Sequence, residues 1–189
     1  METPIRIDLF SDTITKPTPG MRKFMAEAEV GDEQQKEDPS VNKLVEMVCG
    51  LLGKEDAVYL PSGTMCNQIA FRVHCRPGDE IIMDETAHTR HYETGGPAAL
   101  TGAMTYPVPG KRGVFTAEQL EAAVRPASNH LPRSRVALVE QTSNLGGGSI
   151  WPLQGIRSVC AAAHKHGMLC HMDGARLLNA GAATGIKAN

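Results

Sequence analysis

A carboxylate and a guanidinium lie three residues apart near the end of the sequence, at Asp173 and Arg176. An apolar run at residues 167–170 precedes them and a helix-like run at residues 177–180 follows. This order predicts a buried strand with both charged side chains at its carboxyl end, the edge where open α/β sheets bind ligands. A carboxylate there can pair with the protonated ring nitrogen of a cofactor, and a guanidinium can bind a substrate carboxylate. The alternative is an Asp–Arg pair that only caps a helix.

A second candidate binding feature is the turn Pro61-Ser62-Gly63-Thr64, between a predicted strand and a predicted helix. Exposed backbone amides at a helix N-terminus, together with Ser and Thr hydroxyls, form a ready site for an anion such as phosphate. A simple N-cap on a tight turn explains the same residues. Its position after the first predicted strand of the core favours the phosphate site.

His88, His91 and His130 are candidates for proton transfer or metal binding. His88 follows the predicted strand at residues 80–84, so its imidazole falls at the same sheet edge, where it could stack on a cofactor ring and move protons near neutral pH. A surface histidine is the alternative. His91 lies three residues further on, and the pair would suit a metal only with a third ligand, so no metal site is predicted. His130, just before another predicted strand, stays ambiguous from the residues alone.

Alternating apolar and helix-like runs supply the elements that position these residues. Strands are predicted at residues 56–60, 80–84, 104–108, 135–140 and 168–172, and helices at 64–75, 92–100, 116–124 and 153–166. Near-continuous apolar strands separated by helices predict an α/β fold, with a mainly parallel sheet and helices on both faces. Two further helices are predicted at residues 19–30 and 41–52, with Ser40 as N-cap and Gly53 as terminator. We therefore expect residues 1–53 to form a helical arm with an active-site loop and residues 54–189 to begin a larger domain.

Composition argues against several classes of partner. The 189 residues include 19 basic and 21 acidic side chains, a net charge of −2 that predicts neither a nucleic-acid nor an anionic-membrane partner. Apolar runs are strand-sized, far short of a membrane span, and no signal peptide is recognised. The five cysteines contain no CxxC pair, which predicts free thiols in the reducing cytoplasm.

An ordered set of short motifs gives the sequence a family resemblance. The motifs are Asp8-Leu9-Phe10-Ser11-Asp12-Thr13, Thr15-Lys16-Pro17-Thr18, Val30-Gly31-Asp32, Glu37-Asp38-Pro39, Pro61-Ser62-Gly63-Thr64-Met65, Pro107-Val108-Pro109-Gly110 and His171 to Arg176. Together they resemble the threonine aldolases, a family of enzymes dependent on pyridoxal 5′-phosphate (PLP). The resemblance implies the large domain of a fold type I PLP enzyme and a homo-oligomer, a tetramer, with active sites assembled between subunits.

The resemblance also implies roles for the residues that would hold PLP. Gly63 and Thr64 match the turn that binds the phosphate, and His88 matches the histidine that stacks on the ring. Asp173 matches the partner of the pyridine nitrogen.

Roles toward the amino-acid substrate follow in the same way. Arg176, together with Ser11, matches the clamp on the substrate carboxylate, and His130 matches a histidine near the substrate hydroxyl. Either His88 or His130 would act as the catalytic base. The implied reaction cleaves β-hydroxy-α-amino acids, converting threonine or allo-threonine to glycine and acetaldehyde. A β-eliminating or other PLP lyase is the nearest alternative, and a non-catalytic chain that binds a ligand or only assembles is the other.

The sequence departs from the family pattern in three places. Gln35-Lys36 replaces the usual Tyr-Gly before Glu-Asp-Pro, and the segment 140–144 lacks the histidine common there. The family's lysine that forms the Schiff base with PLP lies beyond the Asp173–Arg176 motif, and no lysine here has that context; Lys187 follows too soon. We therefore expect an N-terminal fragment of the PLP domain that is inactive by itself.

Overall fold

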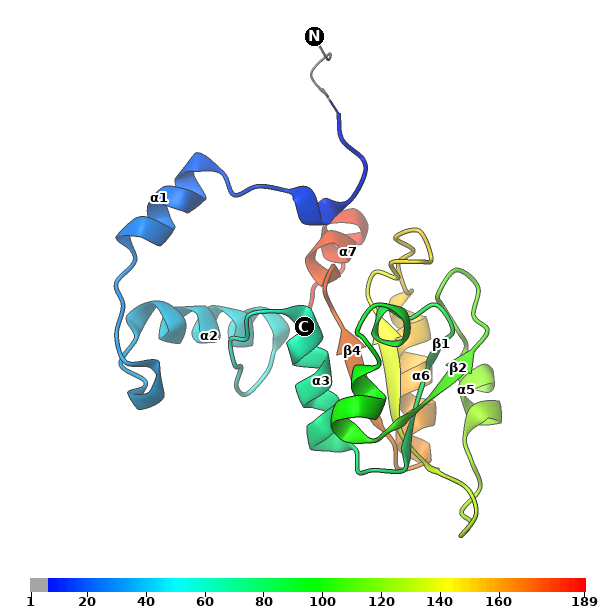
Figure 1. The fold of residues 1–189 in the computed structure, drawn as a ribbon. Helices are drawn as coiled ribbons and strands as arrows, with labels where there is room; N and C mark the ends of the chain where they lie inside the picture. The colour runs from blue at the N-terminus through cyan, green and yellow to red at the C-terminus, as the bar shows by residue number, and fades with distance from the viewer. Residues whose placement is uncertain (1–6) are drawn as a thin grey trace. The chain divides into compact units, whose positions relative to one another are not determined.

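The chain divides between Tyr59 and Leu60 into two units, Met1–Tyr59 and Leu60–Asn189. The computed structural model describes residues 7–189 (Figure 1). The unit from Leu60 onward contains the sheet and every predicted site residue except Ser11.

The first unit contains the two helices predicted from the sequence. Its elements are the short 3₁₀ helices η1 (Asp12–Ile14) and η2 (Glu33–Gln35) and the α-helices α1 (Pro19–Glu27) and α2 (Pro39–Leu52). Gly53 ends α2 in the left-handed region, as predicted. The prediction of Ser40 as N-cap is wrong: Asp38 caps α2 by accepting a 2.9 Å hydrogen bond from the Val41 amide, while the Ser40 hydroxyl donates to the Glu29 carbonyl. Pro39 at the first helical position explains the shift, since proline suits that place.

The second unit is a four-stranded sheet with helices between the strands. In chain order it contains α3 (Gly63–His74), β1 (Asp79–Asp84), α4 (His88–His91), the π-helix η3 (Pro97–Thr101), β2 (Met104–Val108), α5 (Ala117–Ala123), β3 (Arg133–Glu140), α6 (Leu153–Lys165), β4 (Leu169–Asp173) and α7 (Leu177–Thr184). All the pairings are parallel and the strand order is β2-β1-β3-β4. The predicted α/β class with a parallel sheet is confirmed.

Two predicted elements of this region differ in the structure. Residues 56–60 form no strand, and Val58 and Tyr59 are exposed at the division between the units, without the burial that a central strand needs. The predicted helix at residues 92–100 is broken into α4 and η3. Thr94 and Gly95 both adopt positive φ angles, 55° and 68°, and therefore interrupt the helix.

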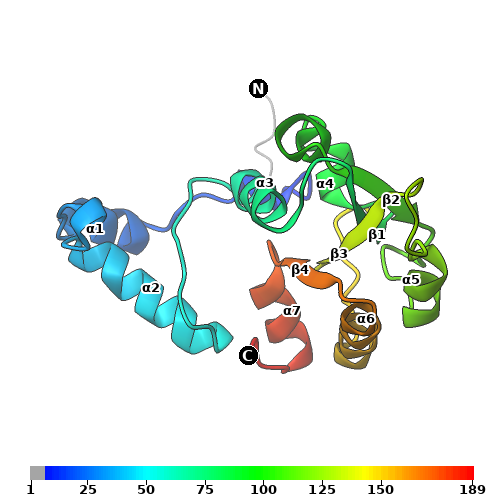
Figure 2. The same cartoon turned by 90° about the horizontal axis from the view of Figure 1, so that it is seen from below.

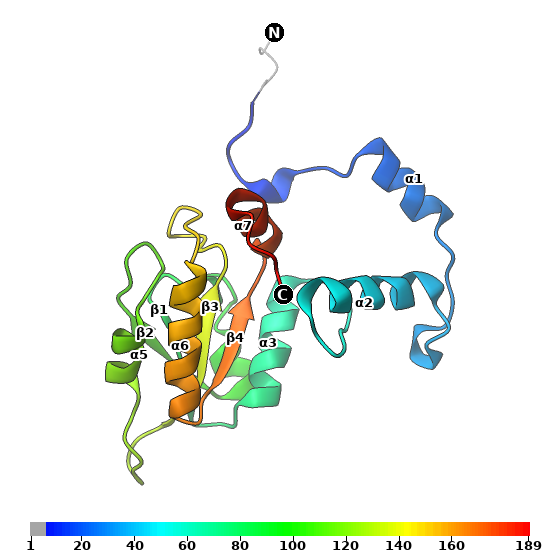
Figure 3. The ribbon, with the colours of Figure 1, turned by 180° about the vertical axis from the view of Figure 1, so that it is seen from behind.

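Apolar side chains from alternate strand positions build a core on each face of the sheet. Ile82 and Val139 point to one face, where they pack with Leu120 of α5 and Val159 of α6. On the opposite face, Ile81, Met83, Val136 and Leu138 pack with Phe71 of α3. Figure 2 views the sheet with α3 on one side and α5 and α6 on the other, and Figure 3 shows α6 crossing in front of β3. No helix within residues 7–189 combines the length and apolar character that a membrane crossing requires.

The strand order creates a switch point between β1 and β3. The chain leaves β1 for β2 on one side of the sheet and later adds β3 and β4 on the other. The connection after β1 packs on the α3 face, through Ala87 and Ala103, whereas α6, after β3, packs on the opposite face. Loops that diverge in this way leave a crevice at the carboxyl ends of the two strands. Because α3 leads directly into β1, its N-terminus lies at this same edge.

Candidate active site

Asp173 is the last residue of β4 and its carboxylate is buried, with the residue 9% exposed. Leu169, four positions earlier, packs on the α3 face, so the two-residue period of the strand directs Asp173 to that face as well. Its Oδ1 accepts a 3.2 Å hydrogen bond from the Ala175 amide, and its Oδ2 accepts a 2.8 Å bond from Asn67 of α3. The strand and the helix therefore fix the carboxylate at the carboxyl edge of the sheet, where the sequence predicted it.

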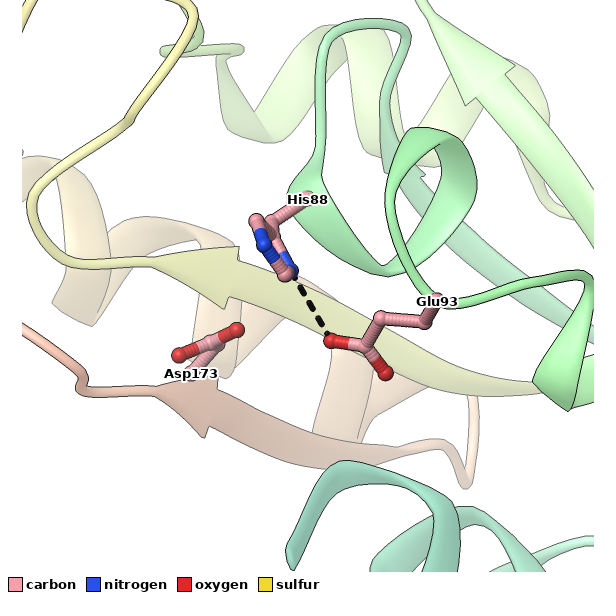
Figure 4. Close-up of side chains that lie close together, drawn as sticks. All are labelled: His88, Glu93 and Asp173. Carbon is pink, nitrogen blue, oxygen red and sulfur yellow. Dashed lines mark hydrogen bonds and ion pairs between the residues drawn. The ribbon is translucent and has the colours of Figure 1, made fainter. Parts of the chain in front are cut away.

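His88 follows β1 and is held through both its backbone and its ring. Its amide donates a 3.3 Å hydrogen bond to Oε2 of Glu140, the residue that ends β3. Its ring Nδ1 lies 3.0 Å from Oε1 of Glu93, and Figure 4 shows this pair beside Asp173. The Tyr92 ring lies 5.4 Å from the His88 ring, centroid to centroid. The structure thus brings the predicted His88 and Asp173 to one place.

Asn67 connects the two halves of this cluster. Its Nδ2 donates to Glu93 Oε1 at 2.9 Å as well as to Asp173 Oδ2, and its Oδ1 lies 2.9 Å from Nε2 of His171. Because the amide nitrogen faces two carboxylates, the atom that faces His171 is the amide oxygen, which accepts a hydrogen bond from Nε2–H of His171. Burial lowers the pKa of His171, partly offset by the negative charge of Asp173, so this imidazole is held neutral with its proton on Nε2. Gln68 donates a further 2.6 Å bond to Glu93 Oε2.

The ligand atoms of His88, Glu93 and Asp173 lie within 4.8 Å of one another, a spacing that a metal ion could also use. The donor set argues for another occupant. Glu93 Oε1 already faces both Asn67 and His88, so its two lone pairs are engaged, whereas each oxygen of Asp173 accepts one hydrogen bond and keeps a lone pair for a further donor. The amides of Asn67 and Ala175 that bond to Asp173 bring no full positive charge. A protonated ring nitrogen would supply both a donor and that charge.

The predicted phosphate turn begins α3. Ser62 is the N-cap and accepts a 3.1 Å hydrogen bond from the Met65 amide. The preceding amides, those of Gly63 and Thr64, have no acceptor among residues 7–189. The position that a Cβ of Gly63 would occupy has no atom within 4 Å. A twelve-residue helix with free amides at this edge can bind an anion.

The predicted substrate residues have separate places. Arg176 is half-buried at the N-cap of α7, and its amide donates to the Gln141 carbonyl at 3.0 Å. Arg176 follows Asp173, the last residue of β4, by three residues, so it lies at the same edge as Asp173. Ser11 caps η1 in the other unit, where its hydroxyl lies 2.8 Å from that of Thr13. The pairing of Ser11 with Arg176 therefore stays a prediction.

His130 is not brought into this cluster within the chain. It is exposed in the loop between α5 and β3, and its amide bonds to Ser128 at 3.1 Å. Since β3 begins at Arg133, this loop lies at the amino edge of the sheet, at the end opposite the arrowhead of β4 in Figure 1. Of the two histidines considered as base, only His88 lies beside Asp173 in the same chain.

Sequence reasoning missed the polar residues that support the site: Asn67, Gln68, Glu93, Glu140 and His171. Asn67 and Gln68 are polar positions on a helix face that also carries Phe71, an unusual pattern for a core-facing surface. Glu140 shows the same signal that identified Asp173, an acidic residue at the end of an apolar strand. Burial raises the pKa of Glu140, opposed by hydrogen bonds from the amides of Asn144 and His88. Glu93 offered no such signal, because it lies in a loop.

Comparisons with known proteins agree with this geometry. The family model described as beta-eliminating lyase matches residues 8–189. The low-specificity L-threonine aldolase 1 of Arabidopsis thaliana is 38% identical over 184 residues, covering 95% of this chain and 51% of that protein. The low specificity L-threonine aldolase of Escherichia coli K12 is 34% identical over 182 residues, covering 96% of this chain and 54% of that protein.

A solved structure supports the fold. The threonine aldolase of Leishmania major superposes with a TM-score of 0.73 at 24% identity, covering 85% of this chain and 46% of that chain. The chain spans about half the length of the curated relatives it matches.

Proposed function

Because the chain belongs to the β-eliminating lyase family, we propose that it is part of a PLP-dependent aldolase that cleaves β-hydroxy-α-amino acids such as threonine. The observation that carries this proposal is that the Asp173 carboxylate and the His88 ring lie in one cluster at the carboxyl edge of the sheet. The 34% and 38% identity with named L-threonine aldolases supports the substrate class.

The residues at this edge fit PLP. The free amides of Gly63 and Thr64 would bind its phosphate, and the buried Asp173 carboxylate would bind the proton on its pyridine nitrogen. The His88 ring, half-buried beside Asp173, would stack on the cofactor. Bound PLP supplies an electron sink for the pair of electrons released when the Cα–Cβ bond of the substrate breaks.

The chain's own residues would position the substrate and move one proton. The Arg176 guanidinium would bind the substrate carboxylate through two parallel hydrogen bonds. With its Nδ1 proton directed to Glu93, His88 would use Nε2 to accept the proton of the substrate β-hydroxyl. Asp173 would hold the proton on the pyridine nitrogen while the bond breaks. Uptake of one proton at Cα, which replaces the one that His88 removes from the hydroxyl, would give glycine, and the other product would be an aldehyde.

Other parts of the proposal rest on the resemblance and on composition. We propose a homotetramer located in the cytoplasm, with a second subunit near each site. Size-exclusion chromatography with light scattering would measure the oligomeric state of the full-length protein.

Product analysis tests the reaction. The full-length protein should release acetaldehyde and glycine in equal amounts from L-threonine or L-allo-threonine when PLP is present. Alcohol dehydrogenase and NADH detect the aldehyde. Release of ammonia and a keto acid, with no glycine, would favour the β-eliminating alternative, since the same cofactor residues serve both reactions. Binding of PLP without either product would favour a non-catalytic role.

A further inference from the structure

Glu93 is a buried carboxylate for which the proposed reaction has no direct use. It is 3% exposed and lies in the loop after α4, five residues beyond His88. The amide nitrogens of Asn67 and Gln68 donate to its two oxygens at 2.9 and 2.6 Å, and Nδ1 of His88 lies 3.0 Å from Oε1. Because Asn67 already donates to Oε1, Glu93 acts as the acceptor in its contact with His88.

This arrangement determines which nitrogen of His88 carries a proton. Because Oε1 of Glu93 accepts, Nδ1 of His88 must donate. Nε2 then has no partner among residues 7–189 and remains available to a ligand. Since Glu140 holds the His88 amide as well, the backbone and the ring of His88 are each fixed by a buried carboxylate.

Glu93 also connects His88 to Asp173. The same Asn67 nitrogen that donates to Glu93 Oε1 donates to Asp173 Oδ2 at 2.8 Å. A change in the position of Glu93 would therefore alter the hydrogen bonds that hold both His88 and Asp173.

We propose that Glu93 is a positioning residue, which orients the His88 ring with its proton on Nδ1 and keeps Nε2 bare for the substrate. The proposal deepens the proposed function, since it assumes that His88 faces the substrate. The contact between Glu93 and His88 can nevertheless be measured without PLP, substrate or turnover.

The first test uses diethyl pyrocarbonate, which reacts with a bare imidazole nitrogen. The full-length protein is freed of PLP, and the reaction rate at His88 is followed against pH by peptide mass spectrometry. Trypsin cleaves after Arg90 and so separates His88 from His91. A carboxylate that accepts from Nδ1 makes the bare Nε2 a stronger nucleophile, so Glu93→Gln should lower the highest rate of modification of His88 several-fold. Glu93→Asp should restore part of that rate.

Other groups near His88 are the same in both proteins. Glu140, Asp173 and Tyr92 also face His88, and their effects cancel when Glu93→Gln is compared with wild type. Glu80→Gln is the matched control. Glu80 is 1% exposed and bonded to Arg125 at the amino edge, so its loss should leave the rate of modification of His88 unchanged.

Activity gives a second measurement. Glu93→Gln should lower kcat on the order of tenfold or more, with KM changed less. A variant that loses thermal stability but keeps the wild-type kcat and the wild-type rate of modification of His88 would show that Glu93 is only structural. Absence of turnover in wild type would contradict the proposed function, whereas the diethyl pyrocarbonate rate would still test Glu93.

A third measurement needs no Glu93 variant and covers the case in which Glu93→Gln does not fold. The ¹⁵N shifts of histidine-labelled protein identify the tautomer of His88, assigned by the signal lost in His88→Gln. We expect a protonated Nδ1 and a bare Nε2. A neutral His88 with the proton on Nε2 would overturn the proposal.

Discussion

Glu140 and Asp173 end adjacent parallel strands in register with each other, as the last paired positions of β3 and β4. Both are buried at the carboxyl edge of the sheet, and Glu140 borders the switch point between β1 and β3. Two neighbouring carboxylates raise the cost of charging either one. Burial is the main cause that raises the pKa of Glu140, and the charge of Asp173 adds to it.

This pair predicts a specific dependence of stability on pH. Because the pKa of Glu140 is raised in the folded protein, its contribution is fully present below its ordinary value of 4.5 and is lost as pH rises through the folded pKa. The free energy of unfolding of wild type should therefore fall relative to that of Glu140→Gln across this window, by at most about 1.4 kcal/mol per pH unit. Urea unfolding at several pH values measures the difference. A free energy of unfolding of wild type that stays constant or rises relative to that of Glu140→Gln would contradict this assignment.

Asp173→Asn in the full-length protein tests the partner of the cofactor nitrogen. The amide cannot hold the pyridine proton, so kcat should fall on the order of 10²-fold while PLP still binds through its phosphate. Asp84→Asn is the control, since Asp84 is a buried aspartate that ends β1 and bonds to Thr86 and Gly110 instead. Steady-state aldehyde release and PLP absorbance report the two effects. Similar losses in both variants would mean that Asp173 acts only on the fold.

Arg176→Lys tests the substrate carboxylate clamp. Lysine cannot copy the two parallel hydrogen bonds of a guanidinium, and losing a charge-assisted bond costs about 1.5–3 kcal/mol. We expect kcat/KM for L-threonine to fall roughly 10- to 150-fold with the PLP absorbance unchanged. Arg157→Lys, at an exposed position of α6, should leave kcat/KM unchanged. An unaltered kcat/KM in Arg176→Lys would place the clamp elsewhere.

The loops at the carboxyl edge give a prediction about stability. Gly113 and Gly148 both adopt positive φ angles, 82° and 73°, but only at Gly113 would a Cβ overlap the buried Ser143. Gly148→Ala should lower the free energy of unfolding by about 1–2 kcal/mol from backbone strain alone. Gly113→Ala should lose that amount and about 1–3 kcal/mol more from overpacking. Denaturant unfolding of the two variants measures the gap, and equal losses would show that Ser143 moves aside.

The sequence predicted β1 and β3, which are largely buried, because the apolar runs before Asp84 and Glu140 are unbroken. It also predicted β4, although His171 interrupts the apolar run there and the strand is half-buried before Asp173. It misplaced a strand at residues 56–60, where the same kind of apolar run has no sheet to join. It predicted His88 and Asp173 as site residues, since each directly follows or ends a strand. Glu93 could not be predicted in this way, because it lies in the loop after α4 and ends no strand.

A similar limit applies to pairs that form across the fold. Asn67 and Asp173 are 106 residues apart in the chain, and their hydrogen bond depends on how α3 packs against β4. His130 shows the converse. Its motif suggested the substrate hydroxyl, but its place before β3 puts it at the amino edge of its own chain. The direction of β3 determines the edge of the sheet at which His130 lies. A residue pattern does not show whether a neighbouring chain lies near that edge.

The most direct test of the central claim is a crystal structure of the full-length protein with PLP. We expect the pyridine nitrogen within hydrogen-bonding distance of Asp173, the His88 ring against the face of the cofactor, and the phosphate on the amides of Gly63 and Thr64. PLP bound away from the carboxyl edge of β4, with Asp173 still bonded only to Asn67 and the Ala175 amide, would contradict the account.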